Sequence, residues 1–169
     1  VSRHDGANSK IAKPCCQVLN NMLMIQESHV ETFIKLPRII ESMVKLLRNH
    51  LEDSVDVMEV LMDVVGRVFH VNSCVVKFKQ VSGADVLLTQ VFDRFTEQSL
   101  KITKTSSGML NLLLKEYGQN DSVAKLTNYA IAMMKAIRTN ASNAEYAEFS
   151  VPMLGAILEM LLAKDKTAV

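Results

Sequence analysis

The sequence has no Trp and little of the residues that make tight turns. It contains 6 Gly and 3 Pro among 169 residues, too few for a β-sandwich or barrel, in which a turn follows every short strand. An excess of charge of one sign is also missing, since 19 Lys and Arg against 18 Asp and Glu give a formal net charge of +1. Nucleic-acid binding needs a basic surface, so we expect no nucleic-acid partner.

Long apolar runs and paired cysteines are missing as well. No run approaches the roughly 18 apolar residues of a membrane-spanning helix, and the first residues lack the apolar core of a signal peptide. The cysteines Cys15, Cys16 and Cys74 are odd in number and lack C-x-x-C spacing, which favours free thiols in a reducing compartment. We therefore expect an intracellular protein, cytoplasmic or nuclear, with no membrane partner.

Motifs for catalysis and for metal or phosphate binding are scarce. Of the four histidines only His70 has a cysteine, Cys74, four residues later, and packing is the favoured role for this pair. No two histidines are spaced as helical metal ligands, and the glycines form neither of the phosphate-binding motifs. The sequence therefore predicts no enzyme, no metal and no cofactor.

Apolar residues at helical spacing are what the sequence has in abundance. Hydrophobic residues make up 49% of the chain, and they recur every three or four residues, which is typical of helices packed on one core. We expect an all-α fold with helices at about 10–25, 52–71, 84–95, 98–117, 121–139 and 151–163, a helix opened by Pro37, short segments at 29–36 and 75–81, and a turn at Ser82-Gly83.

The chain ends differ from this pattern. Residues 1–9 are polar and contain Gly, which predicts a flexible arm that ends at Ser9 as a helix N-cap. We expect one helical repeat domain over 10–165 and a short tail at 166–169.

Short segments of the sequence repeat. Val18–Leu23 aligns with Val60–Val65 at an offset of 42 residues, close to the period of armadillo and HEAT repeats. Weaker matches join Leu36-Pro37 to Val151-Pro152, Leu46-Leu47 to Leu161-Leu162, and Asp53-Ser54-Val55 to Asp121-Ser122-Val123.

These repeats resemble the armadillo family in the core of its third helix. Leu19-Asn20-Asn21-Met22, Leu61-Met62-Asp63-Val64 and Leu126-Thr127-Asn128-Tyr129 look like that core. The resemblance implies a right-handed α-solenoid of about three repeats. Met109-Leu110-Asn111-Leu112 fits the same core, but we prefer a register in which 107–117 is a second helix and 121–139 a third. An irregular helical bundle is the alternative.

Four carboxylates follow one face of the helix expected over 52–71. Glu52, Asp56, Glu59 and Asp63, called here the acidic stripe, recur at intervals of four, three and four residues. Such a stripe either keeps one face of an apolar helix solvated or attracts a basic segment of a partner. Arg67 continues the same face.

The resemblance also implies a binding surface. In armadillo proteins the third helices line a concave groove that holds extended peptides, and Asn21, Asp63 and Asn128 fall at the position of the groove asparagine. Asp63 departs from the pattern because it lacks the amide donors.

From these residues we expect an adaptor or scaffold that binds a peptide or another protein through the groove. The alternative is a structural or oligomerisation domain that packs through its ends, with a second copy of the chain among its partners. The C-terminal residues available for such packing are Val151, Met153, Leu154, Ile157 and Leu161.

Overall fold

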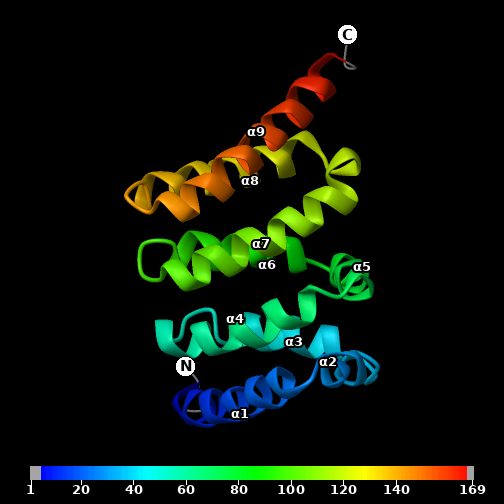
Figure 1. Cartoon of the computed structure of the whole chain (residues 1–169), viewed down its shortest axis with the longest axis vertical. Helices are drawn as coiled ribbons and strands as arrows, with labels where there is room; N and C mark the ends of the chain where they lie inside the picture. The colour runs from blue at the N-terminus through cyan, green and yellow to red at the C-terminus, as the bar shows by residue number, and fades with distance from the viewer. Residues whose placement is uncertain (1–4, 167–169) are drawn as a thin grey trace. The chain divides into compact units, whose positions relative to one another are not determined.

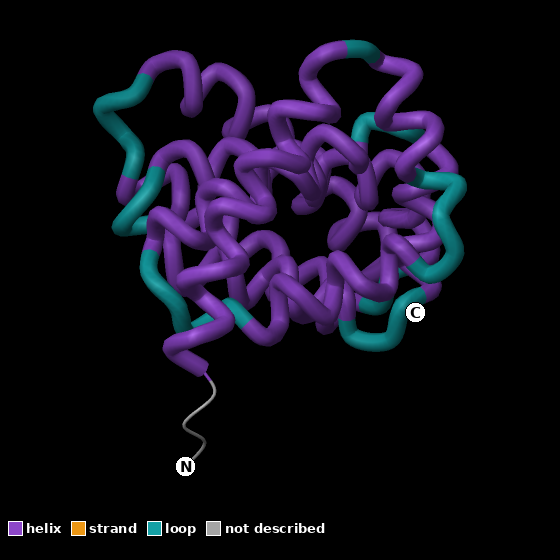
Figure 2. The backbone as a smooth tube through the Cα atoms, turned by 90° about the horizontal axis from the view of Figure 1, so that it is seen from below, coloured by secondary structure: helices purple, strands orange, loops and turns teal. Residues whose placement is uncertain are grey.

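The structure is a computed structural model that describes residues 5–166. Within this range the chain is all helical, as expected, with nine α-helices, one short 3-10 helix and no strand. Short loops join the helices throughout (Figure 2). The helices are α1 Asp5–Ile25, α2 Glu27–Phe33, α3 Ile39–Asn49, α4 Val55–Phe69, α5 Asn72–Gln80, α6 Ala84–Phe95, α7 Leu100–Tyr117, η1 Gly118–Asn120, α8 Val123–Thr139 and α9 Ala144–Lys166.

The chain divides into two compact units at Leu87 and Leu88. The first unit contains α1 to α5 and the first turn of α6, and the second contains the rest of α6 and α7 to α9. Each unit is described by itself below, and the single helical repeat domain expected over 10–165 stays a prediction.

Helix α4 is the centre of the first unit. It packs against α1, α3 and α5, and α3 also packs against α5; Figure 1 shows α1 lying alongside α4. Because apolar residues surround α4, it can present side chains to all three neighbours at once. Its buried residues are Val57, Met58, Leu61, Met62, Val64, Val65, Val68 and Phe69.

The second unit is built around a pair of long helices. Helices α8 and α9 pack closely and run in opposite directions (Figure 1), and α7 packs against α9. Each of the three starts at a side-chain oxygen that accepts a backbone N–H three residues later, which is the N-cap arrangement. Ser99 caps α7 at 3.2 Å, Ser122 caps α8 at 3.3 Å and Asn143 caps α9 at 2.8 Å.

Two expected starts in the first unit are wrong. Helix α1 begins at Asp5, so residues 5–9 are helical rather than an arm, and Ser9 lies inside the helix; residues 1–4 lie outside the described residues. Helix α3 begins at Ile39 rather than Pro37, because Arg38 adopts a left-handed conformation with φ 56° and interrupts the helical run. The expected turn at Ser82-Gly83 is confirmed, with Gly83 at φ 72°.

The expected start of the last helix is also wrong. Helix α9 begins at Ala144, seven residues before the expected 151, and Pro152 lies inside it. The side chain of Asn143 caps the helix and sets this start. Pro152 therefore lies inside the helix, whereas a proline that marks a boundary lies in the first turn. The match between Leu36-Pro37 and Val151-Pro152 therefore joins a loop to a helix interior. The tail residues 167–169 lie outside the described part of the chain.

Helix α7 changes the preferred repeat register. Residues 107–117 are the second half of one continuous helix, Leu100–Tyr117, and not a separate second helix. Buried apolar residues extend along its whole length, from Ile102 to Leu114. Its length and burial match the long helix of the first unit, α4, better than a short amphipathic element.

Candidate functional site

The acidic stripe runs along the face of α4 that is not in the core. Asp56 is exposed, whereas Glu59 and Asp63 are half-buried; Glu52 is exposed and precedes the helix, in the connection from α3. The structure thus brings three of the four carboxylates onto one helix, at the spacing that places them on one side.

Part of the acidic stripe is neutralised inside the protein. Lys13 of α1 forms an ion pair with Asp56, and the Ser54 hydroxyl also donates to this carboxylate. The hydrogen bond from Lys13, followed by that from Ser54, lowers the pKa of Asp56 to about 2. Glu52, Glu59 and Asp63 also interact with other groups of the chain. A basic segment from outside would therefore compete with α1 for Asp56.

Arg67 links the same face of α4 to α1. Its Nε donates to the Asn20 Oδ1 at 2.7 Å. The groove asparagine expected from the repeat pattern, Asn21, is exposed, and it is the neighbouring Asn20 that reaches α4. Sequence reasoning missed Lys13 and Asn20. Their spacing of seven residues places both on one side of α1, and this was the available signal.

Asn128 lies in the second unit, exposed on α8. Seven residues later on the same helix, Lys135 donates to the backbone oxygen of Asp93 at 2.9 Å and lies 3.8 Å from a carboxylate oxygen of Glu97. That Asn128 shares a groove with Asn21 and Asp63 stays a prediction.

A small cavity lies where α1 ends beside α4. It has a volume of about 250 Å³. Nearby, the His29 Nδ1 lies 2.8 Å from the backbone oxygen of Met22. This carbonyl is one of those in the last turn of α1 that have no partner within the helix, and His29 supplies a partner for it. The residues that line the cavity are Leu23, Met24, Glu27, Val30, Arg67 and His70.

The cysteine and histidine pair noted in the sequence is not arranged for nucleophilic chemistry. Cys74 is fully buried, and burial raises the pKa of its thiol, whereas His70 is exposed at the end of α4. A reactive cysteine needs access and a lowered pKa. Within residues 5–166 no group of three or more His, Cys, Asp or Glu side chains is arranged to hold a metal ion.

Helix α1 exposes a row of apolar side chains, called here the apolar stripe. Its members recur at intervals of four and three residues over most of the helix, which places them on one face, as in the seam of a coiled coil. Cys15 is exposed, and the exposed fractions of the other four run from 55% to 70%. The apolar stripe consists of Ile11, Cys15, Val18, Met22 and Ile25.

Helix α9 divides the residues expected at a packing end. Met153 and Ile157 are buried and belong to the core, Leu154 and Leu161 are half-buried, and Val151 is exposed. Phe149, Leu158 and Leu162 are exposed as well. By length and composition alone α9 could cross a membrane: its most apolar window has a mean hydropathy of 1.4, and 22% of that window is buried in the protein.

Comparisons with known proteins add no identification. No family model, no curated protein and no solved structure matches this chain. The surfaces described above are therefore interpreted from their own geometry and chemistry.

Proposed function

We propose that this protein is a non-enzymatic interaction module, an adaptor or scaffold, that associates with a second copy of itself through the apolar stripe of α1. The observation that carries the proposal is the exposure of this stripe. Apolar residues scattered singly over a surface are ordinary, but a contiguous row marks an interaction site.

The spacing of the stripe favours a helix as its occupant. Rows of apolar residues at alternating intervals of three and four are self-complementary, because the side chains of one helix fit between those of the other. The row has no charged member, so two copies meet without like-charge repulsion along the seam. Helix α1 of a second copy can therefore cover the apolar stripe and remove its side chains from water.

The expected strength of this association is modest. Moving a half-exposed Val, Ile or Met out of water contributes roughly 1 kcal/mol, about half the value for full burial. The four Val, Ile and Met residues of each copy then contribute about 8 kcal/mol in the dimer, against an association cost of about 4–15 kcal/mol. The dimer must therefore be sought over a wide range of protein concentration.

The order of helices supports the armadillo-like architecture within this proposal. Helices of 7, 11 and 15 residues, α2 to α4, are followed by helices of 9, 12 and 18 residues, α5 to α7. Two successions of short, medium and long helices are what the family resemblance implies. In this register α7 is a third helix, and Asn111 replaces Asn128 at the groove position.

Light scattering across dilutions tests the proposal. We expect a molar mass that rises toward that of a dimer with concentration, and Val18→Asp should keep the protein monomeric. Val123→Asp is the matched control, because Val123 is exposed to a similar degree, 53%, on another helix. A monomer at every concentration, or a dimer that survives Val18→Asp, overturns the proposal. Loss of the dimer in Val151→Asp alone would instead assign the contact to α9.

A second candidate function is capture of an extended peptide beside the acidic stripe. The cavity where α1 ends beside α4 favours it, because it lies at the end of the same α1–α4 face and its lining includes the carboxylate of Glu27. Replacing Glu59 and Asp63 by Lys should then abolish binding of a basic peptide while circular dichroism shows the fold unchanged. Equal binding before and after the replacement would exclude this function.

A further inference from the structure

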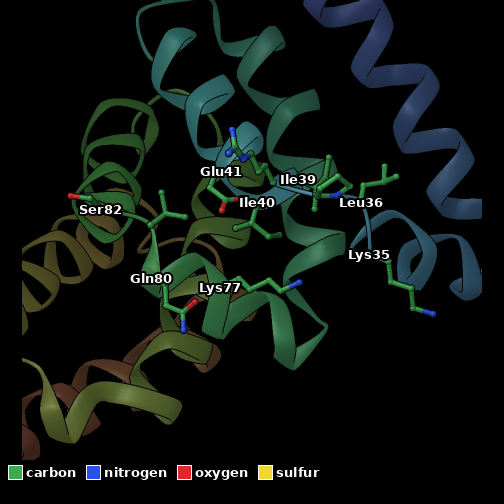
Figure 3. Close-up of a pocket in the computed structure, with 11 residues that line it drawn as sticks. Lys35, Leu36, Ile39, Ile40, Glu41, Lys77, Gln80 and Ser82 are labelled. Atoms are coloured by element: carbon green, nitrogen blue, oxygen red, sulfur yellow. The ribbon is translucent and has the colours of Figure 1, made fainter.

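A larger hollow lies in the first unit, away from the apolar stripe and the acidic stripe. It has a volume of about 520 Å³ and is formed by the link from α2 to α3, the first turn of α3 and the end of α5. This volume lies within the range of about 300–1,000 Å³ of small-molecule sites. Figure 3 shows the residues that line it, which come from segments about 40 residues apart in the sequence.

The hollow has an excess of positive charge. Lys35, Arg38 and Lys77 line it, with Glu41 as the only lining carboxylate. Within the described chain none of these three cations has an ion-pair partner. In Figure 3, the ammonium end of Lys35 points away from the other labelled residues. Lys35 therefore lies at the rim of the hollow, and Lys77 lines it from α5.

The backbone at Arg38 adds to this charge. Arg38 is the residue before α3, and its left-handed conformation is the only one of its kind outside glycine in the described range. No side chain caps the start of α3, and residues 39–41 of its first turn line the hollow, so the positive end of the helix dipole lies at this hollow. The guanidinium and the helix start thus favour the same kind of ligand.

The wall of the hollow is fixed on the side of α5. The Arg48 Nη2 donates to the backbone oxygen of Ser82 at 3.3 Å, which ties α3 to the turn after α5. Apolar side chains complete the lining, among them Leu36, Ile40 and Val81. A ligand here would meet both charged and apolar groups.

We propose that this hollow binds a phosphate monoester, with its phosphate between Arg38 and Lys77 and its organic part against the apolar wall. A phosphate has three acceptor oxygens and about two negative charges at neutral pH, so it can engage two cations and outweigh Glu41. A single carboxylate has half that charge. The source of the phosphate monoester is either a small metabolite or a phosphorylated side chain.

An NMR titration of the full chain tests the site with four probes: inorganic phosphate, glycerol phosphate, a short phosphoserine peptide and the same peptide unphosphorylated. We expect saturable shifts of the amides at 35–41 and 77–82 with a phosphate monoester and none with the unphosphorylated peptide. Tighter binding of the phosphopeptide identifies a protein ligand, and tighter binding of glycerol phosphate identifies a metabolite. Shifts that fail to saturate with every phosphate probe overturn the proposal.

Variants separate this site from general attraction by charge. Arg38→Asn and Lys77→Gln together should weaken binding at least tenfold, and Asn tolerates the left-handed backbone at position 38. Lys45→Gln is the matched control, because Lys45 is an exposed cation of α3 that does not line the hollow; its binding should stay within twofold of the wild type. An equal loss in Lys45→Gln, or full binding by the double variant, contradicts the assignment.

Discussion

Helices α4 and α9 are both apolar, yet they are buried to very different extents. Eight of the 15 residues of α4 are buried, whereas four of the 23 residues of α9 are. Helix α4 has α1, α3 and α5 around it, and α9 is covered by α7, α8 and the short helix η1. Both helices are apolar and both have three neighbouring elements, so neither apolar composition nor the number of neighbours alone predicts how much of a helix is buried.

The same difference separates core residues from surface residues within one sequence pattern. Val18 and Met22 of α1 recur at helical spacing with Leu23, but only Leu23 is buried. Helix α1 meets its unit on one side, so the apolar residues on the other side are left in water. Exposed apolar rows of this kind are where partners should be sought.

The largest effect is expected at the centre of α4. Leu61→Ala should lower the free energy of unfolding by about 2–5 kcal/mol, because Leu61 is 2% exposed and its removal leaves a cavity among three helices. Urea unfolding followed by circular dichroism measures this, since the chain has no Trp to report by fluorescence. Val60→Ala, at a half-buried neighbour, is the control. Equal losses at both positions would contradict the central place of α4.

Neighbouring residues of α9 should behave unlike each other. Ile157→Ala should cost about 2–3 kcal/mol, since Ile157 is fully buried, and Leu158→Ala should change stability by no more than about 0.5 kcal/mol, since Leu158 is 44% exposed. The same unfolding measurement applies to both. A large loss for Leu158→Ala would mean that the outer face of α9 is covered in solution.

A smaller effect is expected where α9 is held by a polar contact. The Tyr146 hydroxyl lies 3.0 Å from the Ser107 Oγ of α7, in the core of the second unit. Tyr146→Phe removes this bond, but Ser107 still donates to the Thr103 backbone oxygen at 2.8 Å. We expect a loss of about 1 kcal/mol. Thermal unfolding of the wild type and Tyr146→Phe measures this loss, and equal midpoints would mean that the contact contributes nothing.

The smallest effect concerns the exposed side of α4 and depends on pH. The ion pair with Lys13 holds the pKa of Asp56 at about 2, below the value of about 3.9 for an unfolded chain. This contribution is therefore complete above pH 4 and is lost as the pH falls through 2. Lys13→Gln removes it, so wild type and variant should differ in urea midpoint at pH 6 and converge near pH 2. A constant difference across this range would exclude the pair as its cause.

Local signals in the sequence predicted much of the fold. The bounds of α6, Ala84–Phe95, are those expected from the apolar spacing and the turn at Gly83. The sequence did not predict the start of α9, because Pro152 suggested a later boundary. The helix is capped instead by Asn143, and this cap depends on the orientation of one side chain. Helical spacing placed Asp56, Glu59 and Asp63 on one face of α4. It could not show that Lys13 of α1 already pairs with Asp56, because that contact joins residues 43 positions apart.

The adjacent cysteines of α1 give the protein a built-in labelling position. Cys15 is exposed within the apolar stripe, while Cys16 and Cys74 are buried and burial raises the pKa of both thiols. A maleimide dye at neutral pH should therefore attach to Cys15 first. The unmodified sequence can thus carry one environment-sensitive fluorophore within the apolar stripe, and its emission would report in real time whether the stripe is exposed to water or covered by a partner.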